Sequence, residues 1–294
     1  MNDRKQHVLL VAKDSFLKKG FAATSVQDIL DEAKISKGTF YNYFSTKNEC
    51  LMAILDNGRD ETTIRRQELM IGQSRADKKL FAEQISVRLM VNRDHNLLPI
   101  FEAVFYSGDA DLKAFARKHH LAELAWLTNR LIEVYGDEAA PFAQECAILM
   151  MGMMQHMIHV WAVDSDEELS AIKLVEYILR RLDSIMSDII KTSDHLLNER
   201  ILRNIDTRHE EYTQTKTEIV QRLERFNEEI DKDVKACSTQ YIQFILNELR
   251  LEHPRIFLLE TILRSFRESF ADTPDEREVH EITSSLWRYL ETLK

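Results

Sequence analysis

Glycine and proline are scarce in this chain of 294 residues, which contains only seven and four of them. The last glycine is Gly152, so almost half of the chain has none. Strand-like alternation of apolar and polar residues is also rare, whereas apolar residues recur at i, i+3 and i+4 along most of the sequence. The sequence therefore predicts an all-α protein.

Cysteine is equally sparse: Cys50, Cys146 and Cys237 are far apart, odd in number and form no CxxC pair. They are most simply reduced thiols of a cytoplasmic protein. The N-terminus is charged from residue 3 and lacks the apolar core of a secretion signal. The richest apolar run, residues 147 to 163, is interrupted by a glutamine and two histidines, so no membrane span is expected.

The sequence contains no nucleophile elbow, phosphate-binding loop or paired catalytic carboxylates, and we therefore do not expect an enzyme. His156 and His159 lie three residues apart on one expected helix. Without an HExxH motif or a cysteine partner, they are more simply hydrogen-bonded residues than metal ligands. No metal or other cofactor is expected.

Positive charge is concentrated at the N-terminus. Residues 1 to 47 hold eight Lys or Arg against five Asp or Glu, a net charge of +3. The whole chain has a net charge of −10, which leaves −13 for the remainder. Because like charges repel, only the first fifty residues are electrostatically suited to bind the phosphates of DNA.

These fifty residues have the pattern of three short helices. The first spans residues 4 to 19, the second starts near Val26 after a Thr24 or Ser25 cap, and the third starts at Lys37 after a Ser36 cap. Only about three residues separate the last two, as a helix-turn-helix requires.

The third helix has a core side and an outer side. Phe40 and Phe44 are four residues apart and are expected to face the core, which turns the polar residues outward. Gly38 has no side chain to hold the backbone away from a DNA groove. The outward residues are Lys37, Thr39, Tyr41 and Asn42.

Residues 4 to about 52 resemble the TetR/AcrR family of transcriptional regulators. The resemblance implies that the second helix of the motif enters the major groove and that dimers read a palindromic operator. The matching residues are Phe16, Lys18, Lys19, Gly20, Phe21, Thr24, Ser25, Val26, Ile29, Ala33, Ser36, Lys37, Gly38, Phe40, Tyr41, Tyr43, Phe44, Lys47 and Leu51.

By position, the resemblance implies that Thr24 and Ser25 contact phosphate and that Lys47 holds another phosphate. Tyr43 stands where the family commonly has histidine, and Asn48 where it has an acidic residue. The candidate DNA-binding residues are Thr24, Ser25, Gln27, Ser36, Lys37, Gly38, Thr39, Tyr41, Asn42, Tyr43 and Lys47.

A long helix capped by Ser45 is expected to run from residue 46 to about 73, followed by helices at 75–92, 97–107, 111–134, 141–164 and 166–193. The last two helices are apolar on more than one face. We therefore expect one face to pack within its own domain and another to pack against a second subunit. The resemblance likewise implies a four-helix dimer interface. The candidate interface residues are Met157, Trp161, Val175, Ile178, Leu182 and Ile185.

The resemblance also implies a small molecule bound inside the helical core. The candidate lining combines repackable methionines with aromatic residues, although plain core packing is the simpler explanation of any single one of them. The candidates are Phe101, Phe105, Trp126, Met150, Met153, Met154 and Met157.

About a hundred residues follow the part of the chain that resembles the family. A long helix is expected from about 197 to 230, then helices at 235–252, 254–271 and 274–293. This extension could be a second ligand module, an additional dimer surface or a partner-binding domain. The expected domains are 1–47 for DNA binding, 48–193 for ligand binding and dimerisation, and 194–294 for the helical extension.

Two functions remain open at this point. The first is a homodimeric repressor that a small hydrophobic ligand releases from a palindromic operator in double-stranded DNA. The second is a DNA-bound adaptor whose C-terminal helices bind a protein partner. A ligand-induced loss of operator binding would distinguish the first from the second.

Overall fold

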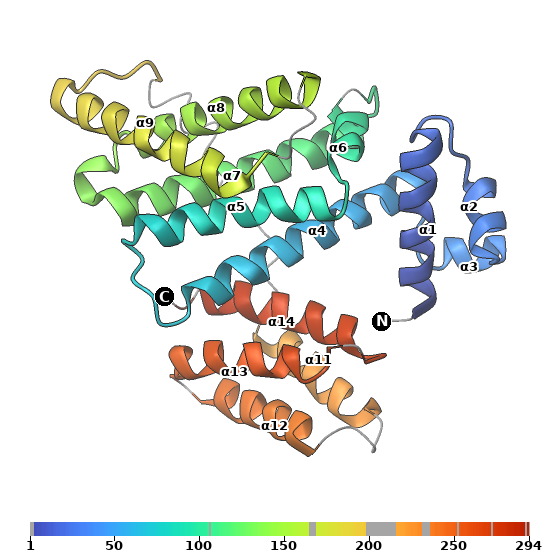
Figure 1. The fold of residues 1–294 in the computed structure, drawn as a ribbon. Coiled ribbons are helices and arrows are strands. Elements are labelled where there is room, and N and C mark those ends of the chain that lie inside the picture. Colours follow the sequence, from blue (N-terminus) through green and yellow to red (C-terminus); the bar gives the residue numbers. More distant parts are fainter. Residues whose placement is uncertain are drawn as a thin grey trace. The chain divides into compact units, whose positions relative to one another are not determined.

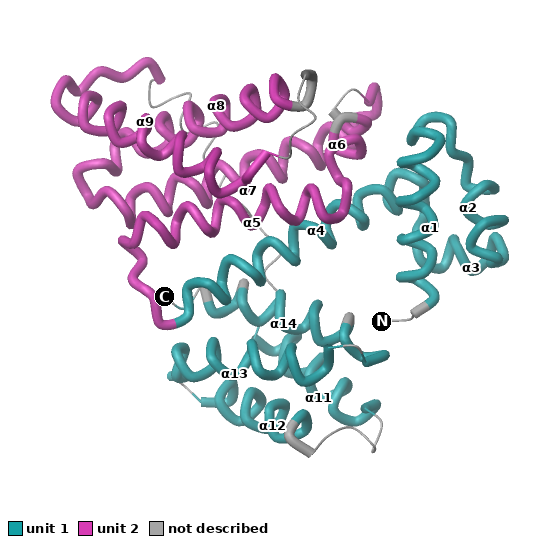
Figure 2. Tube along the Cα trace, viewed as in Figure 1, with its two compact units in different colours: residues 1–71, 210–294 teal, residues 72–209 magenta. Residues whose placement is uncertain are grey.

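The computed structural model describes residues 3–105, 107–164, 169–197, 216–230, 236–251, 253–271, 273–291 and 293. Every regular element in these segments is a helix, which confirms the all-α prediction (Figure 1). The chain groups into two compact units, Met1–Ile71 with Glu210–Lys294 and Gly72–His209 (Figure 2). Among the described helices, none has the length and apolar character needed to cross a membrane.

The first unit begins with α1 (Asp3–Lys19), α2 (Val26–Ala33) and α3 (Lys37–Tyr41). We call residues 3–46 the head. Its core contains Phe40 and Phe44, as the sequence predicts, and both side chains are at most 1% exposed. α3 is short, but the amide of Phe44 still donates to the Phe40 carbonyl oxygen at 2.9 Å. This bond keeps Phe44 one turn beyond Phe40 and inside the core.

α4 (Lys47–Met70) follows the head without a break in the first unit. Its cap is Thr46, whose hydroxyl accepts from the Glu49 amide at 3.0 Å, and not the predicted Ser45. The Ser45 amide instead donates to the Glu49 carboxylate at 2.6 Å. The two bonds tie the residues before α4 to its first turn. The first three turns of α4 bury Leu51 and Leu55, and the helix contacts α1.

The same unit contains α11 (Lys216–Glu229), α12 (Ala236–Arg250), α13 (Ile256–Glu268) and α14 (Glu276–Glu291). Each helix contacts the next, and α11 contacts α14, so the four form a closed bundle that we call the C-terminal module. Its core includes Trp287 and a triad of rings, Phe226, Phe266 and Phe270, with centroids 5.5 to 6.5 Å apart. The three helices predicted at 235–252, 254–271 and 274–293 are therefore confirmed, with shorter ends; residues 198–215 of the predicted preceding helix lie outside the described residues.

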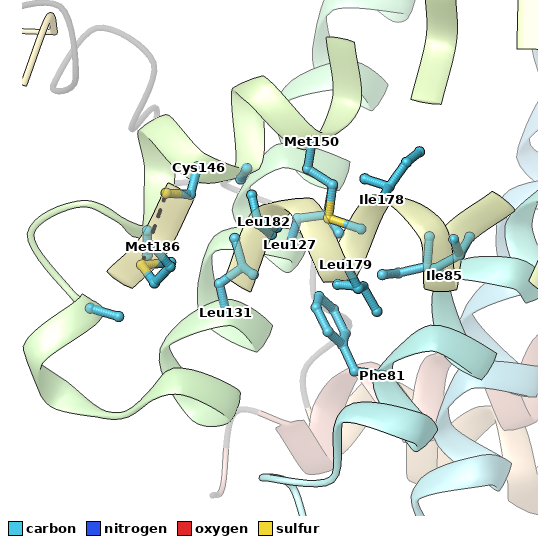
Figure 3. Close-up of a cluster of buried hydrophobic side chains, with 14 of the residues drawn as sticks. Phe81, Ile85, Leu127, Leu131, Cys146, Met150, Ile178, Leu179, Leu182 and Met186 are labelled. Atoms are coloured by element: carbon cyan, nitrogen blue, oxygen red, sulfur yellow. Dashed lines mark hydrogen bonds between the residues drawn. The ribbon is translucent and has the colours of Figure 1, made fainter. Parts of the chain in front are cut away.

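The second unit contains α5 (Lys78–Asp94), α6 (Leu98–Phe105), α7 (Ala110–Tyr135), a 3-10 turn η1 (Asp137–Ala139), α8 (Ala143–Asp164) and α9 (Ala171–Thr192). α9 lies against both α5 and α8, and α7 lies against α8. They share a large cluster of buried hydrophobic side chains (Figure 3). It includes Cys146, whose sulfur lies 3.9 Å from that of Met186.

The units differ from the predicted domains, whose boundaries followed residues 47 and 193. The structure places α4 with the head and joins the C-terminal module to the same unit. The physical reason is that Ile64, near the end of α4, belongs to the apolar core of the C-terminal module.

Candidate DNA-binding site

The start of α2 is fixed by a complete capping box. The Ser25 hydroxyl accepts from the Asp28 amide at 3.1 Å, and the Asp28 carboxylate accepts from the Ser25 amide at 2.8 Å. The C-cap after α2 is Lys34, which adopts the left-handed conformation with φ of 54°. Ser36 then caps α3 by accepting from the Thr39 amide at 3.1 Å. The turn between the two helices is therefore specified at both of its ends.

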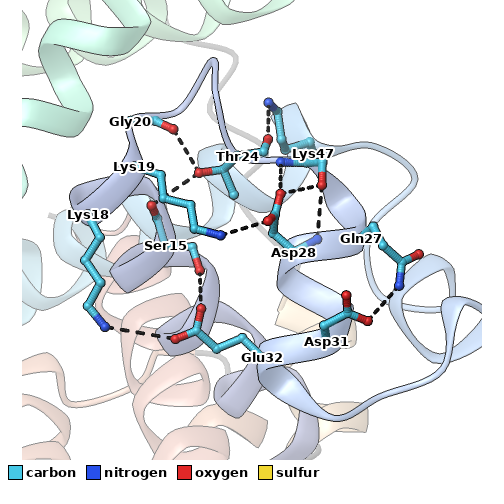
Figure 4. A network of polar contacts seen from close by, with 11 residues as sticks. Ser15, Lys18, Lys19, Gly20, Thr24, Gln27, Asp28, Asp31, Glu32 and Lys47 are labelled. Carbon is cyan, nitrogen blue, oxygen red and sulfur yellow. Dashed lines mark hydrogen bonds and ion pairs between the residues drawn. The ribbon is translucent and has the colours of Figure 1, made fainter.

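Ion pairs hold α1 against α2 (Figure 4). The Lys19 ammonium lies 2.7 Å from the Asp28 carboxylate, and that of Lys18 lies 4.0 Å from Glu32. The hydrogen bond from Lys19, together with those from Ser25, holds the pKa of Asp28 far below its usual range. These two lysines, although part of the net positive charge of the head, are thus paired with acidic residues inside the head.

Thr24 is buried, which contradicts its predicted contact with phosphate. The side chain is 1% exposed, and its hydroxyl lies 2.8 Å from the Gly20 carbonyl oxygen and 3.2 Å from that of Ser15. A buried hydroxyl that donates to backbone carbonyls is not available to a phosphate oxygen. Thr24 instead fixes the connection between α1 and α2.

Lys47 is also used inside the head. Its ammonium donates to the carbonyl oxygens of Phe21 and Thr24, both at 2.7 Å, and lies 4.3 Å from the centre of the Phe21 ring. Partial burial lowers the pKa of this amine. Within the chain Lys47 therefore has a structural role, in which it ties the start of α4 to the α1–α2 connection, and its phosphate contact stays a prediction.

This role predicts the behaviour of Lys47→Ala. Because two backbone carbonyls lose their donor, we expect the free energy of unfolding to fall by about 1–3 kcal/mol. A lost phosphate contact would also lower, by about one, the magnitude of the slope of the logarithm of the binding constant against the logarithm of the salt concentration. We expect no such change. Thermal unfolding and DNA titrations at several salt concentrations measure the two quantities. A smaller slope with unchanged stability would show instead that Lys47 contacts phosphate.

The exposed face of α3 carries most of the remaining candidates. Lys37, Gly38 and Asn42 are exposed, as is Tyr41 at 45%. The Lys37 ammonium lies 5.9 Å from the centre of the Tyr41 ring, so that charge and ring share one surface. These are the side chains expected of a helix that contacts both phosphates and base edges.

Gly38 is not required by the packing of the head. A Cβ atom added there would meet only the Ser36 hydroxyl, at 3.8 Å, which is an ordinary contact. Its φ is not in the left-handed region either. A glycine at this exposed position therefore leaves room for close approach by another molecule.

The other candidates are partly engaged. Ser25 and Ser36 are exposed caps, the Thr39 hydroxyl lies 2.9 Å from that of Ser36, and the Gln27 amide donates to Asp31 at 2.7 Å. Tyr43 is half-buried, with its ring 6.3 Å from that of Phe44. Contacts of these five residues with DNA stay predictions.

Lys34 is a candidate that the sequence reasoning missed. It is exposed in the turn that leads into α3. Residues 34 to 47 contain three lysines and no acidic residue, which is the signal that a local charge count would have found. With Lys47 turned inward, Lys34 and Lys37 provide the positive charge around α3.

The predicted ligand residues lie in or near the core of the second unit. Met150 is fully buried, and Trp126, Met153 and Met154 are partly buried against the same core. Phe101 is half-buried in α6, and the side chain of Phe105 lies outside the described residues. Met157 is 38% exposed and thus cannot line an interior site, which corrects its assignment as a ligand contact.

Three predicted interface residues are buried within their own unit. Val175, Ile178 and Leu182 are at most 1% exposed because α9 packs this stripe against α5 and α8. The prediction that they face a second subunit is therefore wrong, and Ile185 is partly buried against the same core.

The apolar surface lies on α8 instead. From residue 155 to 161 all side chains except Ile158 are exposed, including Met157, Val160 at 56% and Trp161 at 39%. Two of the predicted interface residues, Met157 and Trp161, belong to this surface. We call residues 155–161 the exposed end of α8.

Comparison with known proteins links the head to regulators. Residues 8–54 match the family described as bacterial regulatory proteins, tetR family. The chain is 22% identical to YerO of Bacillus subtilis, described as an uncharacterized HTH-type transcriptional regulator, over 94% of this chain and 92% of that protein. It is 24% identical to YuxN of the same organism, with the same description, over 66% and 67%.

A third relative matches over a short stretch of the chain. The HTH-type transcriptional repressor Rv3405c of Mycobacterium tuberculosis is 38% identical over 50 residues, 17% of this chain and 27% of that protein. The match to YerO covers 280 residues and so includes most of the C-terminal extension. None of these names points to the adaptor role that the sequence left open.

Proposed function

Since this chain is a TetR-family transcriptional regulator with an extended C-terminal region, we propose that it is a homodimeric repressor of a palindromic operator, released by a small hydrophobic ligand. The observation that carries the proposal is the exposed face of α3, where Lys37, Tyr41 and Asn42 surround a glycine that the fold does not need. Lys34 adds a second exposed cation at the start of this face. A repressor of chromosomal DNA acts in the cytoplasm.

Dimerisation is supported by the exposed end of α8. Two turns of an α-helix that expose Met157, Val160 and Trp161 form an apolar surface of the kind that marks protein interfaces. A twofold pair of heads would read two half-sites separated by about one DNA turn or a multiple of it, which is why the operator is proposed to be palindromic.

Repression rather than activation is supported by the printed name of the Mycobacterium tuberculosis relative. Release by a hydrophobic ligand is supported by the methionines around the core of the second unit. Met150, Met153 and Met154 have flexible, polarisable side chains that repack around an inserted apolar molecule at small cost.

The proposal is tested with DNA taken from beside the gene that encodes the protein. We expect an inverted repeat in this DNA to bind with a Kd of about 10⁻⁸ M or tighter, and a scrambled repeat to bind at least about a thousandfold more weakly. Gel-shift titration at fixed salt measures both. Equal affinity for the two fragments would refute specific operator binding.

Tyr41→Ala provides a residue-level check of the same interface. Tyr41 is exposed, so its truncation should leave the melting temperature unchanged but weaken binding of the inverted repeat by about tenfold. Tyr177→Ala is the matched control, because this tyrosine is similarly exposed, at 41%, but lies on α9. Equal affinities of the wild-type protein and Tyr41→Ala would remove Tyr41 from the interface.

A further inference from the structure

α4 belongs to two cores at once. It is a single helix of 24 residues, and thus about 36 Å long at 1.5 Å per residue. Near its start Leu51 and Leu55 are buried where the helix contacts α1 of the head. Near its end Ile64 is 0% exposed and is part of the core of the C-terminal module, with Ile71 packed against that core.

A polar contact reinforces this second attachment. The guanidinium of Arg267 on α13 lies 2.7 Å from the Glu68 carboxylate on α4. Both side chains are largely buried, at 26% and 14% exposure. A pair in this setting is sensitive to the loss of either partner, because the remaining charge stays partly buried without its counter-ion.

The main packing partner of this part of α4 is α14. Val279, Leu286 and Leu290 of α14 are buried in the same apolar cluster as Ile64. Figure 2 shows the head, α4 and the C-terminal module as parts of one compact unit. The extension is thus attached to the helix that carries the head.

We propose that Ile64, Glu68 and Arg267 are positioning residues for DNA binding, through which the C-terminal module fixes the direction in which α4 presents the head. This inference rests on the proposed function of the head. It gives the extension a role in control. A molecule that binds or loosens the C-terminal module changes the direction of the head through α4, and this effect does not require residues 72–209.

The coupling is testable without DNA, by distances between spin labels in the full-length protein. Ala23→Cys in the head and Gln243→Cys on α12 are exposed labelling sites. Burial raises the pKa of the Cys50 thiol to about 12 and that of Cys146 to about 11, so both resist labelling. Cys237→Ser is included in every variant.

The labelled protein should give one narrow distance distribution. Arg267→Met and Ile64→Ala should each broaden it, whereas Arg250→Met should not, because the pair that Arg250 forms with Glu224 in the same module is exposed. The exchange Glu68→Arg with Arg267→Glu should restore the narrow distribution. Distance distributions of unchanged width in both Arg267→Met and Ile64→Ala would overturn the inference. If Ile64→Ala unfolds the module, the distributions of Arg267→Met and of the charge exchange decide whether the inference holds.

Operator affinity is the second measurement. If loosening of α4 leaves the head correctly directed about a tenth of the time, Arg267→Met should bind the inverted repeat about tenfold more weakly. The charge exchange should recover most of this loss, and an affinity of Arg267→Met equal to wild type would also overturn the inference. A wild-type protein that binds no inverted repeat would instead refute the proposed function, and the label distances would still decide whether the module holds α4.

Discussion

Gly38→Glu should abolish specific DNA binding, with an affinity loss of at least about 100-fold, or about 2.8 kcal/mol. The Cβ of the new side chain has room, because outside the adjacent chain the nearest atom is the Ser36 hydroxyl, at an ordinary contact distance of 3.8 Å. Glutamate also has a higher helix propensity than glycine and is favoured near a helix N-terminus. The folded protein should therefore be as stable as wild type or slightly more stable.

The loss of affinity is expected to come entirely from disturbed contacts with DNA and not from unfolding. At the second residue of α3, the new carboxylate projects from the exposed face between Lys37 and Tyr41, where a phosphate or base edge would lie. Thermal unfolding and gel-shift titration measure the two properties separately. Gln243→Glu adds the same charge to an exposed site on α12 and should leave the affinity nearly unchanged. Wild-type affinity in Gly38→Glu would exclude α3 as the DNA-reading helix.

Met157→Arg combined with Val160→Arg should dissociate the proposed dimer, raising its dissociation constant by at least about 100-fold. Both side chains are exposed within the chain, so the substitutions leave the folding core of the second unit intact. In the proposed interface, each arginine would be buried without a partner, which is strongly destabilising. Sedimentation equilibrium measures the dissociation constant, and circular dichroism confirms that the helices remain.

Ile178→Arg provides the contrast for this experiment. Ile178 is 1% exposed in the core of its own unit, so a charge there should unfold the unit rather than separate folded subunits. The double variant should also bind the inverted repeat more weakly, since one head contacts only one half-site. A folded, fully dimeric double variant would place the interface elsewhere.

Local features of the head were predictable because local chemistry specifies them. The Ser25 and Ser36 caps and the buried positions of Phe40 and Phe44 follow from residue type and helical spacing. The contacts of Thr24 and Lys47 with backbone carbonyls do not follow from the sequence, for an equally physical reason. A hydroxyl or an ammonium suits a backbone carbonyl as well as a phosphate, and only the tertiary fold determines which of them lies within reach.

The same limit applies to the apolar helices. The stripe through Val175, Ile178 and Leu182 has the period that a dimer seam would have, and the sequence alone does not distinguish it from a core stripe. The attachment of α4 to the C-terminal module was not predictable either. Periodicity shows that Ile64 lies on an apolar face, but not that its partners come from the last quarter of the chain.

The Glu68–Arg267 contact joins residues that are 199 positions apart, and this has a consequence for biosynthesis. At about 5–20 residues per second, a ribosome adds the residues between them in about 10–40 s. The local contacts of the head are all available well before then, whereas the apolar end of α4 must wait for its partners in the C-terminal module. During this interval we expect the nascent chain to carry a folded DNA-reading surface on a helix whose apolar end is still uncovered, a state that favours aggregation.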